Sequence, residues 1–303
     1  MTILEGKKRN RWMLAVCAVG IHLSIGSIYA WSQIAVSITK QFPNQWSLVQ
    51  ITLCFSIAIV CLGIATLFLG HFVDRKGPKV SGIIAACLFG AGLVGGGIAI
   101  HIGSIYLLYL TYGVLGGFGI GLGYITPVST LLKWFPDRRG LAMGLTIMGF
   151  GFGAAIEVLL LQNLFPALGI TSIATGLIII GAIYFIAMFL SSLYLAPPPK
   201  GWLPNGFTVV KTTVKTSKKH ICEDLDSVTA YGALGTKRFY YLWVMLFINV
   251  CAGIALISVA KFMGEQVILL TSAGAAIMVI FMSPWRQLKM DFTDNYKIFV
   301  TLI

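Results

Sequence analysis

The chain has 303 residues, of which 57% are hydrophobic and 11% are charged, and its formal net charge is +12. Its mean hydropathy is +0.89, whereas about a quarter of the residues of a soluble domain are charged. This composition excludes a soluble globular protein, and apolar stretches of about 18 residues or more predict membrane-spanning helices. Lipid cannot satisfy the backbone of open strands, and these stretches are too long for barrel strands.

Seven stretches, in chain order, predict such helices. They are Met13–Ile38, Leu48–Leu69, Val80–Ile100, Ser104–Leu132, Leu141–Leu161, Thr171–Leu195 and Phe239–Ala260. An eighth stretch, Val267–Met282, is short and has no clear ends. The first stretch is too long for a signal-peptide core and no small-residue cleavage site follows it, so we expect it to be retained as a helix.

The basic residues between these stretches predict the orientation of the chain. The N-terminal tail and residues 70–79, 133–140 and 196–238 together hold 17 Lys and Arg, whereas the alternate segments hold 2. Basic segments stay in the cytoplasm. We therefore expect a multi-pass protein of the cell's inner (plasma) membrane with a cytoplasmic N-terminus. Nucleic-acid binding, the alternative reason for a positive charge, is not expected, because no basic stripe is interleaved with aromatic residues.

The pattern divides the chain into four parts. Residues 1–195 form a six-helix transmembrane half, and residues 196–238 form a Pro-rich and then Lys-rich cytoplasmic link. This link is expected to be solvated, with contact to anionic membrane lipid as the alternative. Residues 239–283 begin a second half with helix 7 and part of helix 8, and residues 284–303 form an atypical tail. The expected fold is therefore an all-α membrane protein with the layout of two-halved secondary transporters.

The loop between the second and third stretches carries the motif Gly70-x-x-x-Asp74-Arg75-x-Gly77-x-Lys79. Gly77 precedes a proline and is expected to turn sharply with a positive φ, while Gly70 is expected to allow close helix approach. The motif resembles the signature loop of the major facilitator superfamily. It favours ion pairs of Asp74 and Arg75 that hold one conformation shut. A basic turn that only sets topology would explain the cations but not the aspartate or the glycine spacing.

Two further features concern helix ends and helix packing. Asp137 follows a proline just before the fifth stretch and is expected to cap that helix. The fourth and fifth stretches are rich in glycine, and small residues four positions apart allow membrane helices to touch backbone to backbone. Close packing is expected at Gly113, Gly117, Gly119, Gly121, Gly123, Gly144, Gly149, Gly151 and Gly153.

Polar groups within the first and fourth stretches are the candidates for substrate binding. The run Tyr-Ala-Trp-Ser that starts at Tyr29 and the run GLGYITPVSTLLKWFPDRRGLAMG resemble the oxalate:formate antiporter family, a major facilitator branch that moves small carboxylates. The resemblance extends from about residue 11 to about residue 279. It implies that Tyr29 and Tyr124 contact a bound carboxylate, with Trp31 near the same lining, and Gln33 is a further candidate. The alternative is that these side chains only pack.

Glu157 is the one carboxylate within the first six stretches. A buried carboxyl without a partner is costly in a membrane, so two hypotheses remain open: a protonated structural group or a proton-coupling group. The family resemblance does not imply an acid at this position. His22 is expected to be a packed and hydrogen-bonded residue and not a proton carrier.

Other site chemistries lack a sequence basis. The six cysteines show no metal-binding spacing, no Gly-rich loop ends in Gly-Lys-Ser/Thr, and the four histidines form no catalytic arrangement. We therefore expect no metal, no cofactor and no enzymatic activity.

The helix pattern and the loop motif predict a secondary active transporter that works by alternating access, and the family resemblance implies small organic anions as substrates, such as oxalate, formate or other mono- and dicarboxylates. The family fold has twelve helices, so we expect a C-terminally truncated form. The resemblance implies that an Arg of helix 8 and a Lys of helix 11 neutralise the anion; these would fall near Met290 and beyond Ile303. The alternatives are an inactive membrane fragment or scaffold, and a homodimer or a separate C-terminal half as partner.

Overall fold

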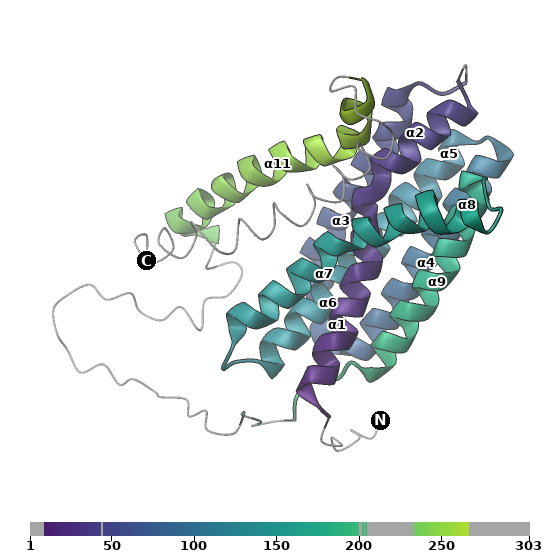
Figure 1. Ribbon diagram of the computed structural model, residues 1–303. Coiled ribbons are helices and arrows are strands. Elements are labelled where there is room, and N and C mark those ends of the chain that lie inside the picture. Colours follow the sequence, from purple (N-terminus) through teal and green to yellow (C-terminus); the bar gives the residue numbers. More distant parts are fainter. Residues whose placement is uncertain are drawn as a thin grey trace, which may run out of the picture.

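A computed structural model describes residues 9–43, 45–199, 202, 204, 232 and 234–266. Every regular element among these residues is helical (Figure 1). The elements are α1 (Arg11–Ile25), the 3-10 segment η1 (Gly26–Ala30), α2 (Trp31–Gln41), α3 (Leu48–Lys76), α4 (Pro78–Ile102), α5 (Ile105–Leu108), the π-helical segment η2 (Tyr109–Gly116), α6 (Gly117–Trp134), α7 (Arg139–Leu159), the π-helical segment η3 (Leu160–Leu164), α8 (Phe165–Ala167), α9 (Ile173–Tyr194) and α11 (Lys237–Gln266).

Among the described residues, seven helices are long and apolar enough to cross a membrane, which confirms the predicted fold class. We number them span 1 to span 7: Arg11–Gln41, Leu48–Lys76, Pro78–Ile102, Ile105–Trp134, Arg139–Ala167, Ile173–Tyr194 and Phe239–Leu256. The predicted eighth helix at Val267–Met282, the tail at residues 284–303 and most of the link at 196–238 lie outside the described residues.

Three of these spans are not regular α-helices throughout. Span 1 changes to a 3-10 helix at η1, near its middle, and spans 4 and 5 contain the π-helical segments η2 and η3. Such irregular segments inside long helices often mark functional positions. Hydropathy does not reveal them, because the apolar pattern continues through each one.

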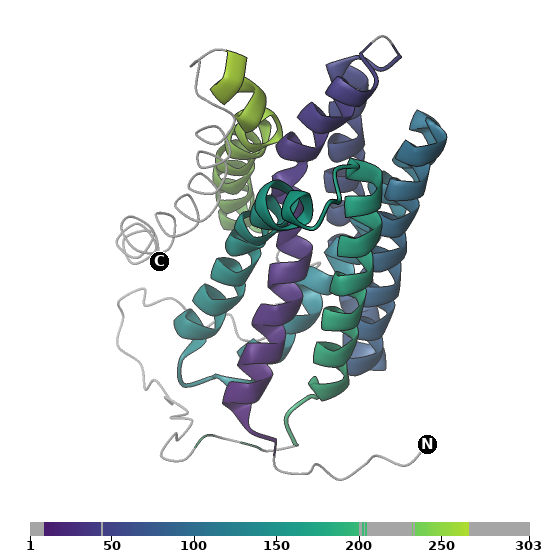
Figure 2. The same cartoon turned by 45° about the vertical axis from the view of Figure 1, so that its right-hand side comes forward.

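Span 1 lies between α7 of span 5 and α9 of span 6 (Figures 1 and 2). Its α1 part packs against α7, α6 and α9, and η1 packs against α7. The remaining spans form the pairs α4 with α9 and α3 with α6. A residue on span 1 can therefore contact spans 4, 5 and 6 at one level of the membrane.

Glycines bring two pairs of helices into backbone contact, as predicted. A Cβ atom added to Gly117 of α6 would lie 2.6 Å from the Ala58 carbonyl oxygen of α3. One added to Gly153 of α7 would lie 2.7 Å from the carbonyl carbon of Gly26 in η1. Both distances are shorter than real Cβ contacts, so only glycine fits without movement. Spans 2 and 4, and likewise spans 1 and 5, are interlocked at these points.

The prediction was wrong for two other glycines. Nothing lies within 4 Å of a Cβ atom placed on Gly70 or on Gly144. Gly70 belongs to the last turns of α3, and its Cβ position has no other described residue within 4 Å. Its expected role in close helix packing is therefore not supported among the described residues.

The seventh span, formed by α11, lies beside the six-helix bundle and not within it (Figure 1). It contacts α2 and, less extensively, α3. Most of its described large apolar side chains are exposed, including Tyr241 at 72% and Ile248 at 63%. The core of the described protein is thus built from spans 1 to 6.

Candidate functional site

Tyr29 and Tyr124 both pack against one phenylalanine. Phe150 of α7 packs edge-on against Tyr29 of η1 at a centroid distance of 5.0 Å and against Tyr124 of α6 at 5.6 Å. Phe150 is buried, whereas both tyrosines are half-buried. Two half-buried phenols from distant parts of the sequence thus pack against the same ring, and they join spans 1, 4 and 5.

His22 extends this aromatic cluster toward the start of span 1. Its ring packs edge-on against Tyr124 at 5.5 Å, and its Nδ1 lies 3.0 Å from the Ala18 carbonyl oxygen. The side chain is fully buried. The prediction that His22 is packed and hydrogen-bonded is confirmed.

Gln33 and Trp31 lie at different places from the two tyrosines. The Nε2 of Gln162 in η3 donates to the Oε1 of Gln33 in α2 at 2.8 Å. Trp31 is fully buried and its ring packs against Tyr112 of η2 at 4.6 Å. Gln162 is a residue that the sequence analysis missed, because a polar side chain near a helix end carries no local signal.

Glu157 lies in the interior of the six-helix bundle, with an exposed fraction of 1%. The groups that interact with its carboxyl are hydroxyls: Ser27 of η1, Tyr112 of η2 and Tyr184 of α9. Neither Glu157 oxygen, nor the Tyr184 hydroxyl, has a hydrogen bond of good geometry within the described part of the chain. Three other spans therefore surround the one buried acid with neutral polar groups.

The motif at residues 70–79 forms the turn that the sequence predicts. Gly77 has φ of 82°, and Pro78 is the first residue of α4. The Nζ of Lys133, at the end of α6, donates a hydrogen bond of 2.9 Å to the Asp74 carboxylate, and the two side chains form an ion pair. Arg75 and Lys79 are exposed and form no ion pair with any described residue. Lys133 was missed as a partner because one cation after an apolar helix reads only as a topology signal.

The expected helix cap at Asp137 was wrong. α7 begins at Arg139 without a side-chain cap, and the Asp137 carboxylate instead accepts two hydrogen bonds of 3.0 Å from Nη1 of Arg11. The Arg11 guanidinium also lies over the Phe135 ring at 5.1 Å. The attraction of a cation from the start of span 1 thus prevails over the local capping pattern.

These contacts gather the basic segments at one end of the bundle. Arg11 reaches residue 137, Asp74 reaches residue 133, and the Nε1 of Trp134 donates to the Ala196 carbonyl oxygen at 2.8 Å. The start of span 1, the loops at 70–79 and 133–140 and the start of the link therefore lie together. The grouping that the charge count predicts is present in the fold.

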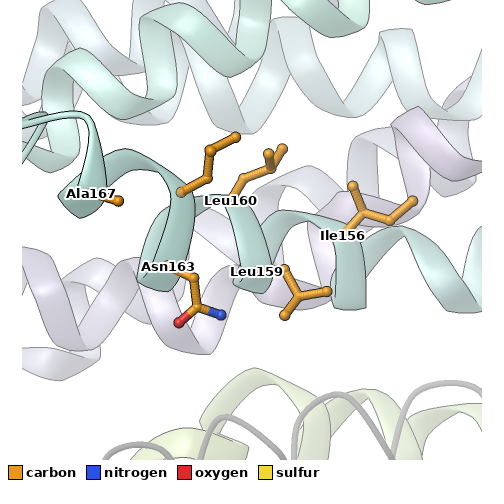
Figure 3. A pocket seen from close by; sticks show the side chains of 6 residues that line it. Ile156, Leu159, Leu160, Asn163 and Ala167 are labelled. Carbon is orange, nitrogen blue, oxygen red and sulfur yellow. The ribbon is translucent and has the colours of Figure 1, made fainter.

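A separate groove of about 550 Å³ lies on the outer side of span 5 and η3 (Figure 3). It is lined by Ile156, Leu159, Leu160, Asn163, Leu164 and Ala167, and Figure 3 shows Leu159 and Asn163 pointing to the same side of the ribbon. Asn163 is the one polar residue of this lining. Such a surface suits apolar chains and has no cation to bind a carboxylate.

The fold can now be compared with known proteins. The profile of the Major Facilitator Superfamily matches residues 12–302. The chain belongs to this family. Its members are transporters and not enzymes, which supports the absence of enzymatic chemistry at a coarse level. The match extends past residue 279 and includes residues 284–302 of the segment 284–303 that the sequence pattern had set apart as a tail.

Individual relatives are similar at modest identity. The "Uncharacterized MFS-type transporter YhjX" of Escherichia coli (strain K12) is 25% identical over 90% of this chain and 63% of its own length. The "Oxalate:formate antiporter" of Oxalobacter formigenes is 27% identical over 82% of this chain and 54% of its own length. Human "Monocarboxylate transporter 14" is 29% identical over 50% of this chain and 29% of its own length. The chain spans less than two-thirds of the length of these relatives.

Proposed function

We propose that the protein acts in secondary active transport of small organic anions, mono- or dicarboxylates such as oxalate and formate, by alternating access. The observation that carries the proposal is the meeting of Tyr29 and Tyr124 on Phe150, in a chain similar to an oxalate:formate antiporter and a monocarboxylate transporter. A phenol O–H donates to a carboxylate oxygen, while aromatic rings exclude water around it. The two tyrosines therefore fit the recognition of a small carboxylate.

The described residues supply donors but no cation at this position. Among the buried polar residues of the described part, Glu157 and His22 are the ones whose side chains can carry a charge. An uncompensated anion in mid-membrane is costly. We therefore propose that the compensating cation comes from outside the described residues, either elsewhere in the chain or from a partner, which could be a second copy or a separate C-terminal half.

The loop at 70–79 is proposed to act as a conformational switch. The Asp74–Lys133 pair joins span 2 to span 4, and more than half of each side chain is exposed. Exposed ion pairs contribute about 0–1 kcal/mol, so this contact is weak enough to break in each transport cycle. Arg75, Lys79 and the Gly70 to Gly77 spacing would then serve partners in the other conformation.

The orientation is also a proposal. The end that carries Arg11, Asp74 and Lys133 is assigned to the cytoplasm of the inner membrane, because basic segments are retained there. Reporter fusions within residues 70–79 and within residues 196–238 test this assignment. Fusions that report opposite sides of the membrane for the two segments would overturn it.

Counterflow into proteoliposomes that hold the purified full chain tests the function. Vesicles loaded with unlabelled oxalate, formate or lactate should accumulate the matching labelled anion above empty vesicles. Tyr29→Phe and Tyr124→Phe remove one donor each and should raise KM roughly 10- to 100-fold, because a hydrogen bond to a charged group contributes about 1.5–3 kcal/mol. Tyr106→Phe is the matched control, since Tyr106 is 81% exposed and its ring packs against Tyr109 at the start of span 4.

Counterflow that does not exceed empty vesicles for any of these anions would end the transport proposal for this chain. It would favour the alternative of a membrane fragment or scaffold without transport activity. Equal KM values for Tyr29→Phe, Tyr124→Phe and Tyr106→Phe would instead refute the proposal that Tyr29 and Tyr124 bind the substrate.

A further inference from the structure

Glu157 is a buried polar group whose role the two tyrosines do not explain. It is buried in the interior of the six-helix bundle, on the same helix as Phe150 and two turns further along. A carboxyl at such a position is stable only if it is neutral or if its charge is matched. No Lys, Arg, His or second acidic group of the described residues interacts with it. A matching charge is therefore missing from the part of the chain that the structure describes.

The hydrogen atoms around Glu157 indicate which form fits. The Ser27 hydroxyl interacts with both the Glu157 carboxyl and the Tyr184 hydroxyl. Its own hydrogen is directed to the Ser24 carbonyl oxygen at 2.7 Å. Ser27 can then only accept a hydrogen bond from Glu157, and an ionised carboxylate has none to donate.

A single added proton resolves this conflict. A protonated Glu157 can donate its O–H to Ser27, whose oxygen has a second lone pair that can accept the O–H of Tyr184. Tyr112 of η2 also interacts with the carboxyl and with Cys54, whose thiol donates to the Leu108 carbonyl oxygen at 3.6 Å. All these neighbours are neutral.

Loss of the proton from Glu157 would change the hydrogen bonds of Ser27 in span 1. An ionised Glu157 needs a donor, and Ser27 can become one only by withdrawing its hydrogen from the Ser24 carbonyl oxygen. That oxygen also accepts the Gly26 N–H at the point where α1 changes to η1. Ser27 and Tyr29 both belong to the five-residue segment η1. A change at Ser27 is therefore transmitted directly to the residue that packs against Phe150.

We propose that Glu157, Ser27 and Tyr184 form a proton-binding site inside the first six spans, and that its occupancy is transmitted through η1 to Tyr29. The ligand is a proton held as a neutral carboxylic acid. Its coupling to substrate is the one step that rests on the proposed function. Transport of an anion together with this proton would carry no net charge for a monocarboxylate.

Infrared spectroscopy of the full chain in lipid vesicles, with ¹³C-labelled glutamate, tests the site without any transport measurement. Exposed glutamates are ionised at pH 7 because their pKa is about 4.3. We expect one labelled band of a protonated carboxyl at pH 7, lost in Glu157→Gln and kept in Glu5→Gln, which changes a glutamate of the polar N-terminal tail. Ser27→Ala and Tyr184→Phe should keep the fold, move the frequency of this band and change the pH at which it titrates by about one unit.

Three outcomes would overturn the proton site. They are the absence of a labelled carboxyl band at pH 7, the same band in Glu157→Gln, and a band frequency that changes in neither Ser27→Ala nor Tyr184→Phe. A band that appears only when Na⁺ is removed would also overturn it, in favour of a cation site. The coupling step is tested by counterflow, which should vary with pH in the wild-type chain and not in Glu157→Gln. The expected carboxyl band together with absent counterflow would refute the proposed transport function but would still support the proton site.

Discussion

Gly153→Ala tests whether spans 1 and 5 are locked together at η1. The new Cβ atom would lie 2.7 Å from the carbonyl carbon of Gly26 and 2.8 Å from its Cα, and closer still to the Leu23 carbonyl oxygen. Ordinary contact begins at 3.4 Å, so η1 and α7 must separate by roughly 0.7 Å or more. The contact atoms belong to the backbone, and a rotamer change cannot relieve the overlap. Overpacking of this kind costs about 1–3 kcal/mol.

Gly144→Ala is the matched control on the same helix. Nothing lies within 4 Å of a Cβ atom at this position, so the substitution should only remove the conformational freedom of glycine. That change stabilises a helix by about 0.5–1 kcal/mol. The two variants, identical in chemistry and nine residues apart, are therefore expected to shift stability in opposite directions.

Thermal unfolding of the purified chain in detergent, followed by tryptophan fluorescence, measures the difference. For a unit the size of the first six spans, 1 kcal/mol corresponds to roughly 2–4 °C. Gly153→Ala should unfold several degrees below the wild-type chain and Gly144→Ala at or slightly above it. An unfolding midpoint of Gly153→Ala equal to or higher than that of Gly144→Ala would refute the interlock of spans 1 and 5.

Two ion pairs at the basic end give further predictions. A double-mutant cycle with Asp74→Asn and Lys133→Gln should yield a coupling free energy below about 1 kcal/mol, because both side chains are more than half exposed. This coupling should fall with added salt. A larger coupling that does not depend on salt would contradict a weak ion pair. The cycle with Arg11→Gln and Asp137→Asn should yield about 1–2 kcal/mol, since these side chains are 24% and 19% exposed and share two hydrogen bonds. Chemical unfolding measures the coupling free energy of each ion pair. Equal coupling free energies would show that the greater burial of the Arg11–Asp137 pair does not strengthen it.

Much of the fold could be predicted because membrane insertion is governed by composition. A span needs about 20 apolar residues, and seven such stretches can be counted without knowledge of their neighbours. The turn at Gly77 is similar, since a glycine before a proline determines its backbone locally. These features depend on interactions within a few residues or with lipid.

Asp137 illustrates where local reasoning fails. A proline followed by aspartate before an apolar helix is a sound capping pattern. The carboxylate nevertheless binds Arg11, which lies 126 residues earlier in the sequence. The Asp137 carboxylate gains charge-assisted hydrogen bonds from the Arg11 guanidinium, and only the arrangement of spans 1 and 5 brings the two groups together.

Glu157 could be found by sequence, but its environment could not. A single acid in an apolar helix is visible in the chain, yet whether it is neutral, paired or hydrated depends on Ser27 and Tyr184. Those residues come from spans 1 and 6, and the irregular segment η1 that presents Ser27 has no signature in the hydropathy pattern. The choice between a structural and a proton-binding carboxyl therefore rests on three-dimensional contacts.

The interlock at Gly153 also limits how a proton signal can reach the tyrosines. Phe150, Gly153 and Glu157 occupy one face of α7, and Gly26 of η1 rests on the backbone between them. Spans 1 and 5 cannot slide past each other there without the overlap that glycine avoids. A change at Ser27 must then be taken up within η1, by turning the segment between its 3-10 form and an α-helical or open form. Tyr29 would rotate against Phe150 while span 5 stays in place, so Tyr29 and not Tyr124 should respond to the state of Glu157.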